Sequence, residues 1–395
     1  MSALQPAAAA LTPSRWATTV GEICDRFGGE VQTGPFGSQL HAADYSEVGT
    51  PVVMPQDMQD GRIVTNQIAR VDSKHVERLK KHKMRVGDVV YSRRGDVGRF
   101  AIVSEAEAGW LCGTGCIRIR LNCPDIDIAY VRRYLQQEAV AKWLDHHAKG
   151  VTMPNLNTTV IRALPFVYPP LPEQRRIAEI LDKADALRTK RRTALAQLDT
   201  LTQSIFLDMF GDPATNPKGW PVKRIEDITE CLDRLRRPVT ESDRKQGNVP
   251  YYGANGQQGW IDTALFDEPL VLVAEDGGYF DEPARGVAYR IDGPAWVNNH
   301  AHILRAMPTH VDTEFLHRAL RHFNFLPFIS GTTRAKLTQG QLNTVKLFVP
   351  PLELQRELGE RVAGVQRIAQ VTASSSDQLH ELFAALQYRA FRGAL

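Results

Sequence analysis

The sequence predicts an α/β (α+β) fold in which two domains of mixed α/β structure are separated by two long antiparallel coiled-coil helices, related by a pseudo-twofold axis. The first observation behind this prediction is an internal repeat: residues 150–212 align without a gap with residues 331–393, at a constant offset of 181 (331 − 150). A repeat this long indicates two domain-sized units, because solenoid repeats run to about 20–50 residues. The second observation is that each copy contains a strand-like run that stops at a Pro-Pro pair and is followed by a long helical pattern.

The helical pattern of the first copy has a clear start and no internal break. Pro172 and Glu173 suit a first helical turn, where a missing N–H costs nothing and a carboxylate meets the positive end of the helix dipole. No Gly or Pro follows until Met209 is passed. In the second copy these two positions are Glu353 and Leu354, so the start of the second helix is less typical.

Apolar residues along both helices recur with the period of 3.5 that is typical of a coiled coil. In the first helix they are Ile177, Ala184, Leu198 and Ile205 at one heptad position and Ile180, Leu187, Ala194 and Leu201 at the other. In the second they are Leu358, Val365, Leu379 and Leu386, with Ile368 and Leu382 at the partner position. The pattern predicts that the two helices pack on each other. The middle of the seam is polar, at Arg191 and at Thr372, Ser374, Ser375 and Ser376, which indicates either a buried layer that fixes the register or an exposed, splayed region.

These patterns divide the chain into five segments. We expect a disordered tail at 1–14, a first mixed domain at 15–170, the first long helix at 171–212, a second mixed domain at 213–351 and the second long helix at 352–395.

Composition sets limits on the class of protein. With 395 residues and 43% hydrophobic content the chain can bury two cores of ordinary size. Five cysteines, an odd number, point to a reducing compartment without a disulfide framework, and we expect a cytoplasmic protein. No apolar run approaches 18 residues and the first 13 residues lack a basic start, so we expect neither a membrane span nor a signal peptide.

Several motifs of catalysis do not occur in the sequence. We find no Gly-x4-Gly-Lys-Ser/Thr phosphate loop, no Gly-x-Gly-x-x-Gly that opens a helix after a strand, and no Asp/Asn-Pro-Pro-aromatic tetrad of an amino-methyltransferase. The sequence therefore predicts no cofactor on this chain.

Three groups of residues raise the question of a metal site. Cys112 and Cys116 have no second pair of comparable spacing, and His300 and His302 have no third ligand nearby in the sequence. Glu275 and Asp276 lack the following Lys of a nuclease site, and a turn after a strand explains them better. We expect no metal.

Polar and basic loops provide the candidate binding residues. Residues 92–98, Ser-Arg-Arg-Gly-Asp-Val-Gly, predict a tight loop from which the backbone and arginines can approach a phosphate or a base edge; a plain hairpin with solvated arginines is the alternative. Asn255, Gln257 and Gln258 are placed in a loop after two tyrosines, and Asn or Gln can bind adenine N6 and N7 together; ordinary turn polarity is the alternative. The net charge of +3 is too small to indicate nucleic acid by itself.

One family matches these features. The run Pro-Pro-Leu-Pro-Glu-Gln-Arg-Arg-Ile-Ala-Glu-Ile-Leu-Asp at 169–182, followed by a long helix and Met-Phe-Gly-Asp-Pro at 209–213, resembles the central conserved region of the specificity subunit of type I restriction-modification enzymes. The second Pro-Pro run, at 350–356, resembles the distal conserved region of that family. Residues 251–259, 271–278 and 296–302 resemble runs found in its target-recognition domains.

The resemblance implies a non-catalytic DNA sequence-recognition subunit. Its two domains would each read one half of an asymmetric, interrupted target in double-stranded DNA, and the helices would fix the gap. We expect DNA contacts from Arg93, Arg94, Arg99, Lys149, Asn155, Arg236, Arg237, Asn255, Gln257, Gln258 and Lys336.

The resemblance also implies partner chains. Two modification subunits would bind S-adenosylmethionine and methylate adenine, and restriction subunits would supply ATP-driven, Mg²⁺-dependent translocation and cleavage. We expect partner contacts from Gln174, Arg175, Glu179, Gln355, Arg356 and Glu360, which are identical between the copies yet lie off the seam; helix solubility is the alternative explanation. The alternative functions are a helix-pair adaptor without sequence-specific DNA binding and a self-contained nuclease or methyltransferase.

Overall fold

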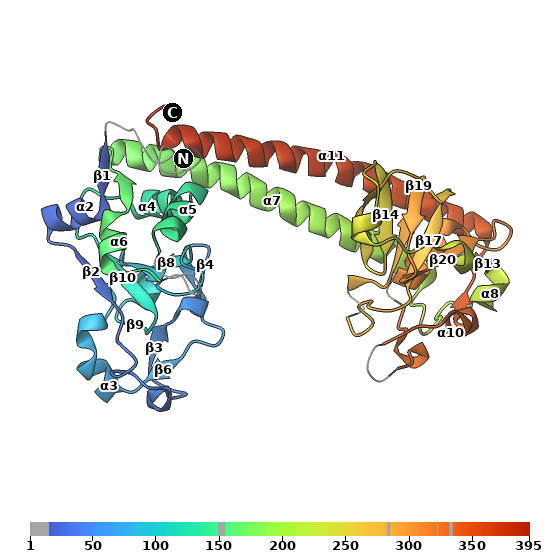
Figure 1. Cartoon of the computed structure of the whole chain (residues 1–395), viewed down its shortest axis with the longest axis horizontal. Helices are drawn as coiled ribbons and strands as arrows, with labels where there is room; N and C mark the ends of the chain where they lie inside the picture. The colour runs from blue at the N-terminus through green and yellow to red at the C-terminus, as the bar shows by residue number, and fades with distance from the viewer. Residues whose placement is uncertain (1–15, 149–154, 283–284, 322, 332–334) are drawn as a thin grey trace. The chain divides into compact units, whose positions relative to one another are not determined.

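The computed structural model describes residues 16–148, 155–282, 285–321, 323–331 and 335–395, and the tail expected at 1–14 lies outside this range. The chain forms two compact units. Unit 1 comprises Met1–Lys190 and Ser376–Leu395, and unit 2 comprises Arg191–Ser375. Each unit therefore contains one mixed domain together with part of each long helix (Figure 1).

Unit 1 is built on a four-stranded antiparallel sheet in the order β2-β10-β7-β8, formed by Glu30–Thr33, Cys116–Arg120, Val89–Ser92 and Phe100–Ile102. A three-stranded sheet has the order β6-β3-β9, formed by Arg70–Val71, Thr50–Val53 and Leu111–Cys112. Two further antiparallel pairs are β1 (Ala17–Thr19) with β11 (Pro165–Val167) and β4 (Met58–Gln59) with β5 (Arg62–Ile63).

The helices of unit 1 cover these sheets. They are α2 (Val20–Phe27), α3 (Ser73–Arg78), α4 (Ile128–Leu135), α5 (Glu138–His147) and α6 (Thr158–Ala163), with 3₁₀ turns η1 (Ala42–Asp44), η2 (Pro55–Asp57), η3 (Lys80–His82) and η4 (Glu105–Glu107). The start of α2 shows why a helix begins where it does. The Thr19 side chain accepts a hydrogen bond from the Glu22 N–H, and the Glu22 carboxylate accepts one from the Thr19 N–H, so two otherwise unpaired donors are satisfied.

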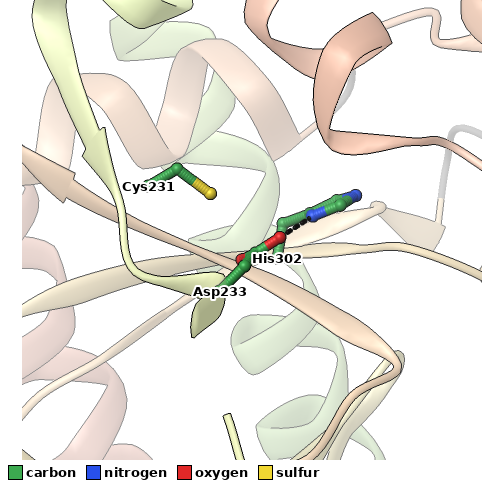
Figure 2. Close-up of side chains that lie close together, drawn as sticks. All are labelled: Cys231, Asp233 and His302. Carbon is green, nitrogen blue, oxygen red and sulfur yellow. Dashed lines mark hydrogen bonds and ion pairs between the residues drawn. The ribbon is translucent and has the colours of Figure 1, made fainter. Parts of the chain in front are cut away.

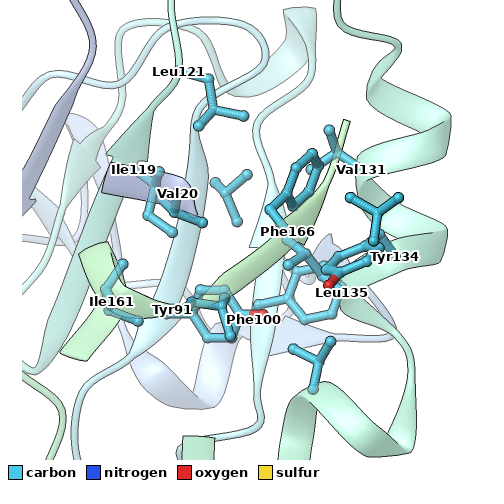
Figure 3. Close-up of a cluster of buried hydrophobic side chains, with 14 of the residues drawn as sticks. Val20, Tyr91, Phe100, Ile119, Leu121, Val131, Tyr134, Leu135, Ile161 and Phe166 are labelled. Carbon is cyan, nitrogen blue, oxygen red and sulfur yellow. The ribbon is translucent and has the colours of Figure 1, made fainter. Parts of the chain in front are cut away.

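The main core of unit 1 joins the sheet, the short helices and the long helices. Tyr134 and Phe166 lie side by side in it, with Phe100 and Tyr91 of the sheet nearby (Figure 3). Phe391, from the end of the second long helix, packs edge-on against Tyr134 with 5.1 Å between ring centroids. The end of this helix is thereby part of the first domain.

Unit 2 repeats the arrangement. Its main sheet has the order β13-β20-β17-β18, formed by Thr229–Cys231, Ala301–Ala306, Leu270–Ala274 and Ala288–Ile291. A second sheet has the order β15-β14-β19-β16, formed by Gly256–Ile261, Val249–Gly253, Pro294–Val297 and Phe266–Asp267, and β12 (Val222–Arg224) pairs with β21 (Lys346–Phe348). The helices are α8 (Ile225–Ile228), α9 (Thr313–Arg321) and α10 (Gln339–Thr344), with 3₁₀ turns η5 (Asp233–Leu235), η6 (Glu241–Asp243) and η8 (Leu326–Phe328).

The two long helices are α7 (Leu171–Phe210) and α11 (Leu352–Ala390). Within unit 1 they run in opposite directions: Arg176 near the start of α7 donates to the carbonyl of Leu395, beyond the end of α11, while Arg188 further along contacts His380 and lies over the ring of Phe383. The predicted fold class, two mixed domains with a pair of long antiparallel helices, is confirmed.

The seam between the helices differs from the predicted one at one of its two heptad positions. Ile177, Leu358 and Val365 are buried as expected. Leu187, Leu201, Ile368 and Leu382, which the heptad pattern puts in the seam, are exposed, whereas positions one residue later in the pattern, such as Leu181, Thr202 and Val362, are buried. The sequence pattern allowed both choices because a heptad seam accepts spacings of three and four, and α7 carries apolar residues at both.

The polar middle of the seam does not form a layer between the helices. Arg191 is exposed, and the buried Thr372 hydroxyl donates to the carbonyl of Ile368 in its own helix, 2.7 Å away. Of the two alternatives, the structure favours the exposed region at Arg191.

A buried glutamine joins each long helix to its domain. The side chain of Gln174 is fully buried: its Oε1 accepts from the backbone N–H of Asp127 at 2.9 Å, and its Nε2 donates to the carbonyls of Asp125 and Pro169 at 3.0 and 2.7 Å. Asp127 in turn caps α4 by accepting from the Tyr130 N–H. We call this arrangement the glutamine clamp.

Unit 2 contains the same clamp. Gln355 is fully buried, accepts from the N–H of Asp312 at 2.8 Å and donates to the carbonyls of His310 and Pro350. Asp312 caps α9 through the Glu314 N–H. The expectation that Gln174 and Gln355 contact a partner chain is therefore wrong: their identity between the copies reflects a shared structural role, and neither side chain reaches the surface.

Among the described residues, the longest helices, α7 and α11, are too polar to cross a membrane, and no other helix there qualifies.

We expect Gln174→Leu to destabilise the start of α4. The substitution keeps the side-chain volume but leaves the Asp127 N–H and two carbonyls without partners, and each unsatisfied buried group costs about 1–3 kcal/mol. Hydrogen exchange of residues 128–135 in the full chain should show a fall in opening free energy of about 2–4 kcal/mol. Gln355→Leu should do the same to α9.

The control is Gln197→Leu, an exposed position on the same helix, which should change the opening free energy by less than about 0.5 kcal/mol. Equal protection in Gln174→Leu and Gln197→Leu would show that the clamp does not stabilise the fold.

Candidate nucleic-acid interface

In unit 1 the predicted residues Arg93, Arg94 and Asn155 come together at one end of the main sheet. Arg93 and Arg94 follow β7, and Asn155 precedes α6. Arg94 and Asn155 form an isolated antiparallel bridge, and the Leu156 N–H donates to the Arg93 carbonyl at 2.8 Å. No sequence pattern indicates this pairing, because the two segments are some sixty residues apart, from 94 to 155.

The Arg93 side chain is held in place by its neighbours. Its Nε donates to the Asn155 Oδ1 and to the Leu156 carbonyl, both at 3.2 Å. Its guanidinium lies 5.8 Å from the centre of the Phe36 ring, which is 57% exposed. An exposed aromatic ring beside an arginine offers a stacking surface for a base or sugar, and sequence reasoning missed Phe36.

The remaining candidates of unit 1 are less organised. Arg94 is exposed, and its carbonyl accepts from the Ser92 hydroxyl at 2.8 Å, which fixes the backbone of the loop. Arg99 forms an exposed ion pair with Asp96 at 3.3 Å, a type of pair that contributes little to stability. Lys149 lies outside the described residues.

Unit 2 builds the same place in the fold from different residues. Asp276 bridges Lys336 as Arg94 bridges Asn155, and the Leu337 N–H donates to the Glu275 carbonyl at 2.8 Å as Leu156 does to Arg93. Glu275 and Asp276 therefore occupy the positions of Arg93 and Arg94. The two units carry opposite charges at equivalent points of the same scaffold.

Glu275 is the centre of a polar cluster in unit 2. Its carboxylate accepts from Lys336 Nζ at 2.9 Å and from Arg236, which also donates to the Ala301 carbonyl at 2.9 Å. Burial opposes ionisation of this carboxyl, but the hydrogen bonds from Arg236 and Lys336 prevail and lower the pKa of Glu275. The carboxylate of Glu275 thus brings together the expected contact residues Arg236 and Lys336, although the sequence alone predicts only a turn at Glu275.

Asn255 belongs to the same cluster. Its Nδ2 donates to the carbonyl of Gly277, in the turn that follows Glu275 and Asp276, at 2.9 Å. On the other side of the turn, His300 Nδ1 lies 2.7 Å from the Asp276 carboxylate. Four segments of unit 2 therefore meet at residues 275–277.

Gln257 and Gln258 lie on strand β15 and not in a loop, which corrects the sequence prediction. Ala254 and Asn255 form the turn of the β14–β15 hairpin, and Gly256, the first residue of β15, has a positive φ of 107°. Both glutamines are exposed, and Trp260, further along the strand, is 54% exposed. β15 is the edge strand of its sheet, so these side chains form an outward polar and aromatic surface.

The two glutamine side chains differ in how firmly neighbouring residues hold them in place. Gln258 accepts from Asn298 Nδ2 at 3.2 Å and lies against Gly253, where any added Cβ would come within 2.3 Å of the Gln258 amide. Gln257 donates only to the nearby Gly259 carbonyl, at 3.2 Å, in the hydrogen bonds of the described residues. Arg237 is exposed, and its carbonyl accepts from Trp296 Nε1 at 2.6 Å.

Among the described residues, one group of His, Cys, Asp or Glu side chains lies close enough together to suggest a metal site. It consists of Cys231, Asp233 and His302 (Figure 2). His302 Nδ1 faces the Asp233 carboxylate at 2.5 Å and its Nε2 faces the Leu337 carbonyl at 2.7 Å, so both nitrogens are already engaged. Burial raises the pKa of Cys231 to about 12, which disfavours the thiolate that a metal requires. The arrangement is better explained as an internal hydrogen-bond network.

The exposed candidates for partner contact are four. Arg175 and Glu179 lie on the outer face of α7, and Arg356 and Glu360 lie on that of α11. Glu179 pairs with Lys183 at 2.6 Å, and Arg175 lies 3.9 Å from Asp127.

Residues 19–198 and 217–379 match the family described as the type I restriction modification DNA specificity domain. The chain is similar to a putative type I restriction enzyme specificity subunit of Haemophilus influenzae, with 35% identity over 136 residues, which are 34% of this chain and 34% of that protein. It is also similar to a putative type I restriction enzyme specificity subunit of Methanocaldococcus jannaschii, with 20% identity over 369 residues, which are 85% of this chain and 84% of that protein.

The fold is shared with solved structures. A specificity subunit from Mycoplasma genitalium aligns with a TM-score of 0.56 and 16% identity over 95% of both chains. A chain from a structural study of complex assembly and conformational transition of the type I restriction-modification system aligns with a TM-score of 0.61 and 17% identity over 97% of this chain and 99% of the other. With the family match over both units, the chain belongs to the family of type I restriction-modification DNA specificity subunits.

Proposed function

We propose that the chain reads a bipartite DNA sequence, with one half-site bound by each unit. The observation that carries the proposal is the repeated site. In unit 1 a bridge joins the turn after β7 to the segment before α6, and in unit 2 a bridge joins the turn after β17 to the segment before α10. Both bridges lie at the same end of the main sheet of their unit. The side chains there are Arg93, Arg94 and Asn155 in unit 1, and Glu275, Asp276 and Lys336 in unit 2.

The chemical difference between the two sites supports an asymmetric target. Arginines suit phosphates and guanine, whereas a carboxylate such as that of Glu275 or Asp276 can accept from cytosine N4. Two sites with opposite charge at equivalent positions would not prefer the same bases. In this proposal α7 and α11 set the gap between the half-sites.

The proposed partners are two modification subunits, which would bind S-adenosylmethionine, and restriction subunits, which would use ATP and Mg²⁺. Support comes from exposed apolar residues on the long helices. Leu187, Leu201 and Leu207 of α7 correspond, at the repeat offset of 181 (368 − 187), to Ile368, Leu382 and Tyr388 of α11, and all six are exposed. Exposed apolar residues that recur in both copies fit two binding surfaces for one type of partner, because solubility alone would not retain them.

Each unit carries one copy of this apolar set. Unit 1 has Leu187, Leu382 and Tyr388, and unit 2 has Ile368, Leu201 and Leu207. Arg175, Glu179, Arg356 and Glu360 would contribute a polar rim, and they remain expected contacts.

An adaptor that uses the helices for protein partners alone would not need polar clusters at the sheet ends. It would also lack the steep loss of affinity with salt that phosphate contacts cause, so titration with duplex DNA at several salt concentrations separates the two functions.

The central test exchanges the proposed DNA-binding segment of unit 2. We expect replacement of residues 222–330 by the matching segment of a relative to change only one half of the methylated sequence, because the exchanged segment holds Glu275, Asp276 and β15 of unit 2 and no residue of unit 1, while Lys336 stays in place. The other half-site and the gap should stay the same, since α7 and α11 are untouched. Genome-wide mapping of methylated adenines measures all three. A simultaneous change in both half-sites would contradict the two-reader proposal.

Single residues should separate base reading from phosphate binding. Gln257→Ala is expected to relax specificity at one or two base pairs, at about 1–3 kcal/mol for each lost contact. Arg94→Gln is expected to weaken binding to all sequences alike and to make the salt dependence shallower by about one unit of slope. Competition binding of the assembled methyltransferase against single-base variants, at two salt concentrations, distinguishes the two effects.

Gln59→Ala, at an exposed position of the β4–β5 hairpin, serves as the control and should change neither quantity. A uniform loss in Gln257→Ala would reassign β15 from base reading to positioning.

The docking surfaces can be removed one at a time. Leu187→Glu with Leu382→Glu in unit 1 should abolish binding of one of the two modification subunits. Leu201→Glu with Ile368→Glu in unit 2 should abolish binding of the other. Burying a carboxylate in an apolar contact is expected to weaken binding by roughly a hundredfold or more, at about 3 kcal/mol or more. Native mass spectrometry of the co-expressed complex counts the bound subunits.

Gln197→Glu with Gln378→Glu, two exposed positions that are also identical between the copies, is the matched control. Two bound subunits in every variant would place the docking surface elsewhere.

A further inference from the structure

Unit 2 contains a cavity of about 580 Å³ where α9 meets α7 and α11. His317, Arg318 and Arg321 of α9 line one side of it, and the small residues Ala363 and Ala369 of α11 line another, with Gln366 between them.

The internal repeat shows what fills this place in unit 1. Arg133 and Arg318 are equivalent, since each lies six residues after the clamped aspartate (133 − 127 and 318 − 312), and both are buried. Arg133 donates to Asp182 at 2.6 Å and pairs with Asp185 at 2.9 Å, both on α7. At the repeat offset the residues of α11 are Ala363 and Gln366.

A third position of α11 also has a smaller side chain than the equivalent position of α7. Arg188, which packs over Phe383 and hydrogen-bonds His380 in unit 1, corresponds to Ala369. The cavity of unit 2 therefore lies where unit 1 places two carboxylates and a guanidinium.

One polar side chain that lines this cavity has no hydrogen-bond partner among the described residues. The side chain of His317 is only 8% exposed, and neither of its ring nitrogens makes a hydrogen bond within the described part of the chain. The nearest carboxylate, Glu314 Oε1, is 3.8 Å from Nδ1, which is too long for a hydrogen bond. Burial lowers the pKa of His317, against the opposing effect of Glu314.

The other charges that face the cavity balance one another. Arg318 donates to Glu314 at 2.7 Å and to the Thr202 hydroxyl at 3.1 Å. Arg290 pairs with Asp292 and Glu314, and Arg321 lies 3.6 Å from Asp199. Three arginines thus face three carboxylates, which leaves His317 as the group that needs a partner. A singly charged acceptor would balance an imidazolium at His317, whereas a phosphate dianion would leave one negative charge uncompensated.

We propose that the cavity binds a carboxylate, which accepts a hydrogen bond from His317 and takes the place that Asp182 and Asp185 fill in unit 1. The site is separate from the residues proposed to contact DNA. The carboxylate belongs either to a small free acid or to an Asp or Glu side chain of a bound chain, and the chemistry at His317 is the same for both.

The test follows the titration of His317. Mass spectrometry measures deuterium exchange at Cε1 of each histidine against pH, in sodium formate and in sodium chloride of equal ionic strength. Formate should raise the half-titration pH of His317 by about one unit, in a saturable way, because an adjacent carboxylate favours the imidazolium. His41, an exposed histidine of unit 1, should not respond.

A second arm identifies the source. A rise that appears only when modification subunits are bound assigns the carboxylate to a partner side chain; this arm rests on the proposed function, and native mass spectrometry of the same sample shows whether the subunits are bound. If they do not bind, the docking proposal fails and the formate result alone decides about the cavity. An equal response to chloride, or no response in any sample, overturns the carboxylate site.

Matched variants supply or withhold the carboxylates. Ala363→Asp with Gln366→Asp should raise the half-titration pH of His317 without formate and abolish the formate effect. Ala363→Asn with Gln366→Asn has nearly the same shape and should give no rise of its own. If the aspartate variant folds and His317 titrates as in the unchanged chain, the proposal is wrong; if it does not fold, the formate titration of the unchanged chain decides.

Discussion

The glutamine clamp is the interaction on which the rest of the structure depends. Gln174 and Gln355 each satisfy one backbone N–H and two carbonyls in the interior, so each fixes the start of a long helix against the start of α4 or α9. An amide suits this task because it offers a donor and an acceptor without a charge, which would be costly to bury. Through Asp127 and Asp312 the clamp also sets where the short helices begin.

A backbone fixed in this way leaves the side chains at its edges free to differ. The bridge between Arg94 and Asn155 recurs as the bridge between Asp276 and Lys336, although the charge at the first position is reversed. The packing of Asp182 and Asp185 on Arg133 recurs as a cavity beside Arg318. In both cases the hydrogen bonds of the main chain preserve the geometry, so a change of side chain alters the chemistry and keeps the fold.

The sequence predicted the features that depend on local pattern. The repeat, the long helices and their antiparallel pairing follow from spacing and from Pro-Pro boundaries, and the structure confirms them. Burial was harder, because Gln174 looks like a surface residue until the backbone of Asp127 is placed beside it. In the candidate site, residue type and loop context pointed to Arg93 and Arg94, and the structure brings Asn155, also among the expected contacts, beside them. Phe36 and Glu275 were missed, since only the tertiary structure brings Phe36 beside Arg93 and Lys336 beside Glu275.

The two sites differ in how much positive charge they can offer to a phosphate. In unit 2 the cations Arg236 and Lys336 are already paired with Glu275, so a phosphate that approaches them must compete with a carboxylate held within hydrogen-bond distance. In unit 1 Arg94 is exposed and the Arg93 side chain is held by neutral acceptors, so both keep their full charge for a phosphate. Because phosphate contacts supply affinity and base contacts supply specificity, unit 1 would contribute more of the salt-dependent affinity. Unit 2, with its carboxylates and the amides of β15, would contribute more through base edges.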